Sequence, residues 1–327
     1  MEIRINGFHD SYLTKPRTSA IKGIFILLIV LSHSLGYIRN SGYDFNAFGD
    51  RFFNTFFILV SQLVVVMFLF YSGYGVSESF KKKGTGYVQG FPKKRILTTL
   101  LNFDVAVIAF IVLSFGLGVS VSLKTGLLSL TGWESVGNSN WYIFVILLCY
   151  VFSYFVLRIP FHRQEYRVVL LFALCLLSIV VLSRFKESWW FDTILSYPMG
   201  FLFSTYKERF EFYSKRYYWP AGCVLLLLFA AFYFCPNGTM HLPFNAVSIL
   251  FALLCVMITM KVSIGCPVLQ WCGSHLFPIY IYMRIPMMLI EHQQPELTKT
   301  QPAFFILISL AVTLVIASLY RFWQIKL

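Results

Sequence analysis

The chain has 327 residues, of which 58% are hydrophobic, 19% aromatic and 13% charged, and its formal net charge is +13. A soluble domain carries roughly a quarter charged residues, so this composition, with a mean hydropathy of +0.71, excludes an ordinary soluble protein. The basic excess does not indicate a nucleic-acid partner, because most Lys and Arg residues lie between the apolar runs. The seven cysteines show no CxxC spacing, and no metal site is expected.

Long apolar runs predict transmembrane helices, because a helix satisfies its own backbone groups where lipid cannot. A span needs about 20 apolar residues. The candidate spans, in chain order, are 18–38, 54–77, 96–118, 141–158, 167–183, 190–206, 217–234, 241–262, 268–291 and 303–325. We therefore expect an all-α, polytopic integral membrane protein of about ten transmembrane helices in one bundle. Residues 1–327 are expected to form a single transmembrane domain without a soluble domain.

The basic residues orient these spans, since short loops rich in Lys and Arg stay in the cytoplasm. With the N-terminus inside, 19 of the 27 basic residues fall in inner segments, six in outer loops, and two, Lys22 and Arg284, within spans. This distribution predicts that both termini are cytoplasmic.

The first span carries two ionisable side chains, Lys22 and His33, eleven residues apart. Eleven residues at about 100° each bring the second side chain to within roughly 20° of the first, about 16 Å further along the helix. Ionisable groups inside a membrane are costly and indicate functional sites. Lys22 alone is explained by snorkelling to the inner surface, and His33 alone by a neutral imidazole bonded to a serine or a carbonyl. Their shared face favours a functional role.

The third span contains Asp104, and two roles are open for it. It orients the imidazole of His33, as a carboxylate orients a catalytic base, or it neutralises Lys22, since buried charges usually pair. Asp104 lies about 12 Å from the inner end of its helix, and His33 lies about 22 Å from the inner end of its own. Depth therefore favours pairing with Lys22.

The outer loop 119–140 and the start of the fourth span carry aromatic and polar side chains: Trp133, Glu134, Asn140 and Trp141. Such side chains suit sugar binding. An interfacial aromatic belt uses tryptophan as well. The loop is expected on the same membrane side as His33.

The ninth span contains Arg284 at a depth similar to that of His33, and Tyr280, four residues earlier, shares its face. Two functional roles fit Arg284: holding the oxyanion of a tetrahedral intermediate, or binding a phosphate or carboxylate of a substrate. A snorkelling arginine at the interface is the alternative, and the residues that follow it, including Pro286 and Glu291, disfavour it.

Six short motifs follow one another along the chain: KGIFILLIVLSH at 22–33, FLFYSGY at 68–74, KKRI at 93–96, NWYI at 140–143, YPMG at 197–200 and WCGSHLFPIYIYMR at 271–284. Apolar strings match easily, so each motif alone is a weak signal. Together and in this order they resemble the acyltransferase-3 family of membrane O-acyltransferases. Lysine at position 22, in place of the commoner arginine, resembles the fucose-4-O-acetylase-like branch.

The chain departs from the family at three positions. Ile146 stands where many members have a glutamate, Arg284 replaces a late histidine, and Thr98 stands near a usual second arginine. These departures leave the reaction class in place, and they leave the acceptor and the acid–base pairing open.

The resemblance implies an O-acyltransferase, most simply an O-acetyltransferase, that moves an acetyl or succinyl group from acyl-CoA to a hydroxyl of a cell-surface or lipid-linked saccharide. It implies the bacterial inner membrane as the location, and membrane lipid, acyl-CoA and the saccharide as partners. No cofactor is expected to be permanently bound, and the oligomeric state is left open.

The same resemblance implies roles for individual residues. His33 suits a general base or a transient acyl carrier, together with Lys22, Asp104 and Arg284. Lys94 and Arg95, which match the KKRI motif, suit the phosphates of CoA, although the positive-inside rule also produces such a cluster. The triplet 81–83 has the same two explanations.

A polytopic transporter, flippase or polymerase of polysaccharide biosynthesis is the alternative function. Transporters often show internal repeats and helices broken at the midplane, whereas this sequence shows no repeat and one strong interruption, at 197–200. A polymerase would typically carry a large outer loop. A membrane scaffold without chemistry is a third interpretation, which the ionisable residues within the spans disfavour.

Overall fold

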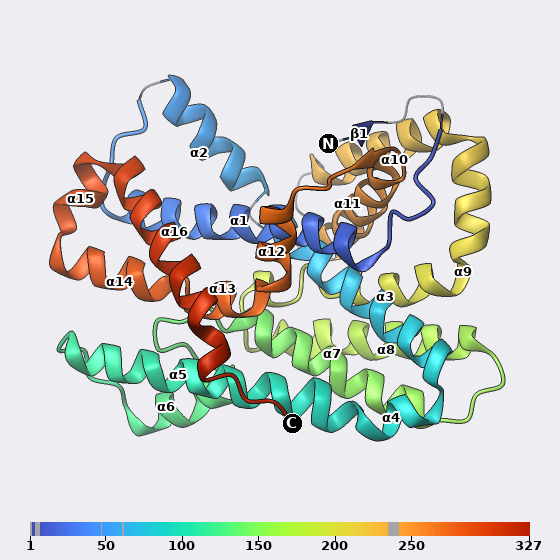
Figure 1. The fold of residues 1–327 in the computed structure, drawn as a ribbon, viewed down its shortest axis with the longest axis horizontal. Coiled ribbons are helices and arrows are strands. Elements are labelled where there is room, and N and C mark those ends of the chain that lie inside the picture. Colours follow the sequence, from blue (N-terminus) through green and yellow to red (C-terminus); the bar gives the residue numbers. More distant parts are fainter. Residues whose placement is uncertain (1, 4–6, 47, 61, 235–241) are drawn as a thin grey trace. The chain divides into compact units, whose positions relative to one another are not determined.

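A computed structural model describes residues 2–3, 7–46, 48–60, 62–234 and 242–327 of the chain. These residues are mostly helical (Figure 1), and the one strand pair among them is short: β1 (Glu2–Ile3) lies antiparallel to β2 (Val262–Ser263). The expected all-α class is confirmed. The chain folds into two compact units, each assembled from segments that are far apart in the sequence.

The first unit comprises residues 1–18, 65–96 and 145–266. Its elements are β1, the first turn of α1 (Lys15–Asn40), α3 (Val66–Lys83), α4 (Thr85–Phe91), a π-helical segment (Pro92–Leu97), most of α7 (Trp141–Arg158), α8 (Gln164–Leu182), a 3₁₀ turn (Ser188–Trp190), α9 (Ser196–Arg216), α10 (Tyr218–Tyr233), α11 (Leu242–Lys261) and β2.

Two glycines let α3 and α9 cross closely in this unit. A Cβ on Gly73 would overlap the backbone carbonyl of Tyr197, and a Cβ on Gly200 would overlap that of Phe70. Small residues at such a crossing bring two helix backbones into van der Waals contact, which is the main attraction between helices in lipid. The glycines of the FLFYSGY and YPMG motifs therefore serve helix packing.

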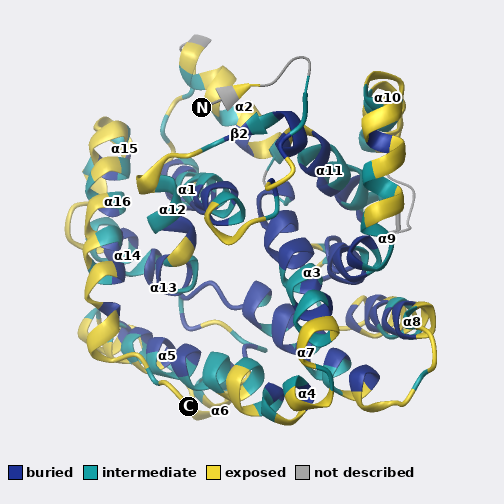
Figure 2. Cartoon of the chain, turned by 45° about the vertical axis from the view of Figure 1, so that its right-hand side comes forward, coloured by how far each residue is buried: buried dark blue, intermediate teal, exposed yellow. Residues whose placement is uncertain are grey.

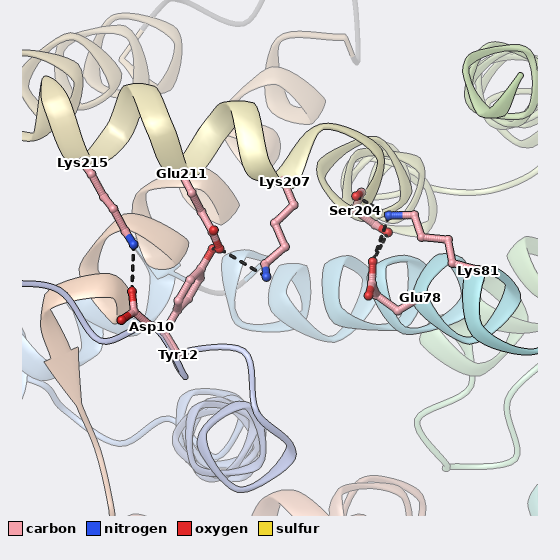
Figure 3. Close-up of polar contacts among 8 residues, drawn as sticks. All are labelled: Asp10, Tyr12, Glu78, Lys81, Ser204, Lys207, Glu211 and Lys215. Atoms are coloured by element: carbon pink, nitrogen blue, oxygen red, sulfur yellow. Dashed lines mark hydrogen bonds and ion pairs between the residues drawn. The ribbon is translucent and has the colours of Figure 1, made fainter.

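A polar cluster ties the same two helices together further along α3 (Figure 3). The hydroxyl of Ser204 donates to the carboxylate of Glu78 over 2.6 Å, and the ammonium of Lys81 lies 3.0 Å from that carboxylate. Lys81 also donates to the backbone carbonyl of Ser204. The first lysine of the triplet 81–83 therefore takes part in helix packing.

The segment before α1 is bound to α9 by side chains (Figure 3). Asp10 lies 2.8 Å from Lys215, and the hydroxyl of Tyr12 donates to Glu211 over 2.9 Å. Glu211 also lies 3.3 Å from Lys207, one turn earlier on α9. Burial, and after it the nearby Glu211 carboxylate, raises the pKa of Tyr12. The phenol is therefore held as a neutral donor.

The sequence predicted a helix from residue 190, but residues 191–195 form turns and α9 begins only at Ser196. Asn245 of α11 explains this, because its side chain accepts from the backbone N–H of Leu195 and donates to the carbonyl of Phe191, each over 3.1 Å. These bonds hold the backbone ahead of Ser196 in a non-helical path. The helix that follows extends to Arg216, but its backbone is kinked at Tyr206 (φ −111°, ψ 20°), the residue at which the span was predicted to end.

The second unit comprises residues 19–64, 97–144 and 267–327. Its elements are the rest of α1, α2 (Phe48–Val60), a 3₁₀ turn (Leu63–Val65), α5 (Thr98–Gly116), α6 (Leu123–Leu130), α12 (Pro267–Ser274), α13 (Leu276–Tyr282), α14 (Arg284–Gln293), α15 (Pro295–Thr300), α16 (Pro302–Leu319) and a final 3₁₀ turn (Tyr320–Phe322).

A glycine pair also joins α1 and α12 in the second unit. A Cβ on Gly23 would overlap the carbonyl of Leu269, and a Cβ on Gly273 would overlap that of Ser19. These two glycines belong to the first and last of the six motifs. The close crossing therefore fixes α1, which carries Lys22 and His33, against the segment that leads to Arg284.

The outward faces of single helices suit lipid. On α16 the buried residues Phe305, Ser309, Thr313 and Ala317 recur every fourth position, so they form one stripe. Exposed positions of α16 and α10 are yellow in Figure 2, and large apolar side chains stand at such positions: Leu307 of α16 is 63% exposed and Leu227 of α10 is 69% exposed. Lipid solvates such surfaces directly, whereas water would not.

Seven helical segments of the described chain are long and apolar enough to cross a membrane: α1, Leu63–Lys83, Thr85–Gly116, α7, α8, Pro243–Lys261 and Pro302–Phe322. The pair α9 and α10 passes the same test together, bent by 105°. A multi-pass membrane architecture is confirmed, with seven or up to eight such segments among the described residues where the sequence predicted about ten spans. Residue 241, the predicted start of the eighth span, lies outside the described residues.

Two predicted spans differ most from the structure. The span at 54–77 is divided, because α2 ends at Val60 and the next helical turn begins at Leu63. The span at 268–291 is three short helices, α12, α13 and α14. Pro278 and Pro286 each lie in the first turn of α13 and α14, where a missing N–H costs no helical hydrogen bond. Each proline therefore favours a new helix start.

Candidate active site

A cavity of about 510 Å³ lies in the second unit. Its lining residues come from three segments: Ser32, His33, Gly36, Tyr37, Arg39 and Asn40 of α1, Gly137 of the loop before α7, and Arg284, Met288 and Glu291 of α14. The structure thus brings together His33 and Arg284, which lie 251 positions apart in the chain. The sequence predicted that these two residues lie at a similar depth in the membrane, and in the structure they line the same cavity.

Helix α1 presents its polar groups as a stripe. A helix turns once in about 3.6 residues, so His33, Tyr37 and Asn40, at spacings of four and three, lie on one face. Between them Ser34 points elsewhere, because its buried hydroxyl donates to the carbonyl of Val30 over 2.9 Å. The apolar run that precedes His33 supplies the packing face, and the stripe supplies the cavity wall.

Helix α14 repeats the same spacing with different chemistry. Arg284, Met288 and Glu291 also follow at intervals of four and three, and all three line the cavity. Glu291 is the single carboxylate in the described lining. The two facing stripes therefore combine an imidazole, a phenol, an amide, a guanidinium and a carboxylate around one space.

The guanidinium of Arg284 lies beside an aromatic ring. Its central carbon is 5.7 Å from the ring centroid of Tyr37, within the range of a cation–π contact. The Nε of Arg284 is buried and has no hydrogen-bond partner among the described residues. A guanidinium held by a ring, with a donor still unused, is suited to an anionic oxygen.

The loop before α7 closes one side of the cavity at Gly137. This glycine has φ +100°, and a Cβ there would lie 2.7 Å from Cε and 2.8 Å from Sδ of Met288. Asn138 stabilises the turn, since its Oδ1 accepts from the backbone N–H of Val136 over 3.0 Å. A residue with a side chain at 137 would therefore press on Met288.

Of the predicted saccharide-binding residues, those of the 119–140 loop lie outside the described cavity lining. Asn140 is buried, and its amide donates to the carbonyl of Gly132 over 2.8 Å. The ring of Trp133 packs on Phe144, with centroids 5.4 Å apart. Glu134 stands next to Trp133 in this same turn. The contacts of Asn140 and Trp133 hold the loop in shape.

Trp141 and Tyr280 likewise do not belong to the described lining. The ring of Tyr280 is 2% exposed and meets the ring of Tyr142 edge-on at 5.3 Å. Trp141 packs on the same Tyr142, at 6.2 Å. The hydroxyl of Tyr280 is buried without a hydrogen-bond partner among the described residues. Tyr280 therefore packs in an aromatic cluster next to α14, the helix that carries Arg284.

The two other predicted catalytic residues also lie elsewhere in the second unit. Lys22 and Asp104 are absent from the described lining of the cavity that contains His33. The Oδ1 atom of Asp104 is buried and accepts no hydrogen bond from the residues that the structure describes. A role for Asp104 in orienting His33, and its pairing with Lys22, both stay predictions.

Lys94 and Arg95 belong to the first unit, in the π-helical segment before α5. The guanidinium of Arg95 lies 6.0 Å from the ring centroid of Tyr150, whereas Lys94 is exposed. Neither lines the smaller cavity of about 250 Å³ between α4 and α7. Lys94 is thus available to a solute, and Arg95 is packed on an aromatic ring. Their contact with CoA stays a prediction.

Sequence reasoning did not select Tyr37, Asn40 or Glu291 for the site. Helical spacing could have identified each of them, because residues four and seven positions apart lie on one helix face. Tyr37 and Asn40 stand four and seven residues after His33, and Glu291 stands seven residues after Arg284. Among the described residues, no three His, Cys, Asp or Glu side chains gather as metal ligands would.

Comparisons with known proteins give one match. The model of the family described as "Acyltransferase domain" (Acyl_transf_3) matches residues 19–321, which is nearly the whole chain. No curated protein and no solved structure matches the chain. The matched range includes every residue of the cavity.

Proposed function

The chain belongs to the acyltransferase-3 family, and on this premise we propose that it moves an acyl group, acetyl or succinyl, from acyl-CoA to a hydroxyl of a cell-surface or lipid-linked saccharide. The family makes it a membrane acyltransferase; the donor, the acceptor and the acyl group are the proposed parts. One observation carries the proposal: His33 and Arg284 line the same cavity.

His33 is the proposed general base. An alcohol is a weak nucleophile until its proton is removed, and a neutral imidazole removes protons well near neutral pH. The imidazole nitrogen takes the proton of the acceptor hydroxyl while the alcohol oxygen forms a bond to the thioester carbonyl carbon. The carbonyl oxygen then carries the negative charge of a tetrahedral intermediate.

Arg284 is the proposed stabiliser of that charge. The Nε donor of its guanidinium is buried and unpaired among the residues that the structure describes, and a preorganised donor at a developing oxyanion lowers the barrier without reorganisation. When the intermediate collapses, the carbon–sulfur bond breaks and the thiolate of CoA takes the proton from the His33 imidazolium. The products are an ester and free CoA, and His33 is neutral again.

The residues proposed to bind the acyl donor, CoA, follow from the distribution of basic residues along the sequence. We propose that Lys94 and Arg95 contact the phosphates of CoA in the cytoplasm, and that both termini are cytoplasmic in the inner membrane of a bacterium. Lys94 supports this by its exposure. The family match favours an acyltransferase over the transporter, flippase or polymerase that the sequence left open.

Replacement of His33 tests the proposal directly. Cells carrying His33→Ala at normal expression should lose O-acylation of their envelope saccharide by about 10²–10⁴-fold, the usual contribution of a general base. The measurement is the ester content of the purified saccharide, together with transfer from labelled acetyl-CoA or succinyl-CoA by the purified protein.

His292→Ala is the matched control, since His292 is an exposed residue of α14 outside the described lining. It should leave the ester content unchanged. An unaltered ester content in His33→Ala cells would exclude His33 from catalysis.

A further inference from the structure

The cavity has two polar ends on the same pair of helices. His33 and Asn40 lie seven residues apart on α1, and Arg284 and Glu291 lie seven residues apart on α14. Seven helical residues span about 10 Å. The two helices run in the same direction in Figure 1, so Asn40 and Glu291 both lie further along than His33 and Arg284.

The far end differs in chemistry from the reacting end. Glu291 supplies a carboxylate, which accepts strong hydrogen bonds from hydroxyl groups. The amide of Asn40 both donates and accepts, and the ring of Tyr37 lies between the two ends. Carboxylate, amide and aromatic ring together match the hydroxyls and the apolar face of a sugar ring.

A positively charged side chain also lines the cavity at this end. Arg39 also lines the cavity, but its guanidinium donates to Oδ1 of Asn54 over 2.8 Å. Asn54 is a neutral partner, so Arg39 keeps its positive charge in the same cavity as the carboxylate of Glu291. The charges of Arg39 and Glu291 balance each other, so this end carries no net charge and suits an uncharged polyol better than a second ion.

We infer that Tyr37, Asn40 and Glu291 form the subsite that holds the acceptor, and that they select an uncharged sugar ring with neighbouring free hydroxyls. The inference rests on the proposed function, because it assumes that the cavity receives the acceptor of acyl transfer. With the ring held at the Asn40 end, a hydroxyl of the same or the next sugar unit reaches His33 about 10 Å away.

Binding of simple glycosides tests the subsite without the reaction. The probes are the methyl glycosides of glucose, galactose and fucose, and methyl glucuronide as the anionic comparison. Calorimetric titration of the full chain in lipid nanodiscs should show that a neutral glycoside binds more tightly than the glucuronide. Glu291→Gln should weaken that binding about 10- to 100-fold, as expected for loss of a charge-assisted hydrogen bond, and should narrow the difference between the two classes.

Glu296→Gln is the matched control, because Glu296 is an exposed carboxylate of α15 that pairs with Lys299. It should bind the glycosides as the unchanged protein does, and a thermal melt of both variants should match. Equal affinity of Glu291→Gln and the unchanged protein overturns the inference. So does the absence of glycoside binding by the unchanged protein, or tighter binding of the glucuronide.

Labelled acetyl-CoA or succinyl-CoA in the same preparation separates the two claims. Glycoside binding that depends on Glu291, together with no transfer of either labelled acyl group to any acceptor, would refute the proposed function and retain the subsite. Transfer by the unchanged protein with glycoside affinity independent of Glu291 would retain the function and refute the subsite.

Discussion

Gly137 forms part of the cavity wall with a backbone conformation that only glycine adopts readily. Its φ is +100°, in a region where a Cβ meets the following carbonyl oxygen. Replacing it by alanine adds two separate costs: the backbone strain, and the approach of the new Cβ to Met288. The substitution therefore tests both the loop geometry and the cavity.

The two costs have different sizes. The strained backbone costs about 1–2 kcal/mol. The new Cβ would stand 2.7 Å from Cε of Met288, so that flexible side chain must leave its rotamer at a cost of roughly 0.5–1.5 kcal/mol. The total is about 1.5–3.5 kcal/mol, which lowers the unfolding midpoint by roughly 3–14 °C. The displaced Met288 also narrows the cavity.

Gly42→Ala isolates the backbone term. Gly42 has φ +82° and open space around its Cβ position, so its replacement should cost only the strain and should leave acyl transfer unchanged. The assays are thermal unfolding in nanodiscs and transfer from labelled acetyl-CoA or succinyl-CoA. If Gly137→Ala unfolds at the same temperature as the unchanged protein, the strain argument is wrong. If it unfolds like Gly42→Ala and keeps full transfer, the contact with Met288 has no effect.

Three further substitutions probe the packing. Gly73→Ala should sharply lower the yield of folded protein, because the new Cβ would overlap a carbonyl of α9. Gly75→Ala is the control and should leave the yield nearly unchanged, because nothing lies near its Cβ position. Equal yields of the two variants would refute the close crossing. Asn102→Ala removes two hydrogen bonds of 2.9 Å to the backbone of Ile325, which should cost about 2–3 kcal/mol and speed carboxypeptidase digestion, with Ser318→Ala as the control. The raised pKa of Tyr12 stabilises the fold at pH values below the usual tyrosine pKa of about 10. That stability is lost as the pH rises above this value. Tyr12→Phe should therefore make the free energy of unfolding depend less on pH in the alkaline range. An unchanged pH dependence in that range would refute this.

Hydropathy and charge predicted the class of the protein because they depend on local composition alone. Depth along a helix is also local, and it placed His33 and Arg284 at similar levels before any contact was known. The direction in which a side chain points across the bundle depends on which helices are neighbours. Asn140 illustrates this, since the same amide that suits a sugar turns inward to Gly132.

Broken helices escaped prediction for a related reason. Pro278 and Pro286 were visible in the predicted ninth span, but a proline inside an apolar run allows either a kinked span or a new helix start. The hydrogen bonds of Asn245 to the backbone of Phe191 and Leu195 join segments about fifty residues apart. No local pattern contains such a contact, so the turns before α9 could not be predicted.

The motifs that indicate the family and the residues that line the cavity are largely different sets. Gly23, Gly73, Gly200 and Gly273, which lie in four of the six motifs, stand where a Cβ would overlap another helix, so those motifs preserve helix crossings. Of the residues on the α1 wall of the cavity, only Ser32 and His33 fall inside a motif. We therefore expect the motifs to determine the fold and the reacting histidine, and the stripe beyond His33, with Glu291 opposite, to determine which hydroxyl is acylated. Replacing Tyr37 and Asn40 by other residues should therefore change which acceptor is acylated more than it changes the rate of acyl-CoA hydrolysis.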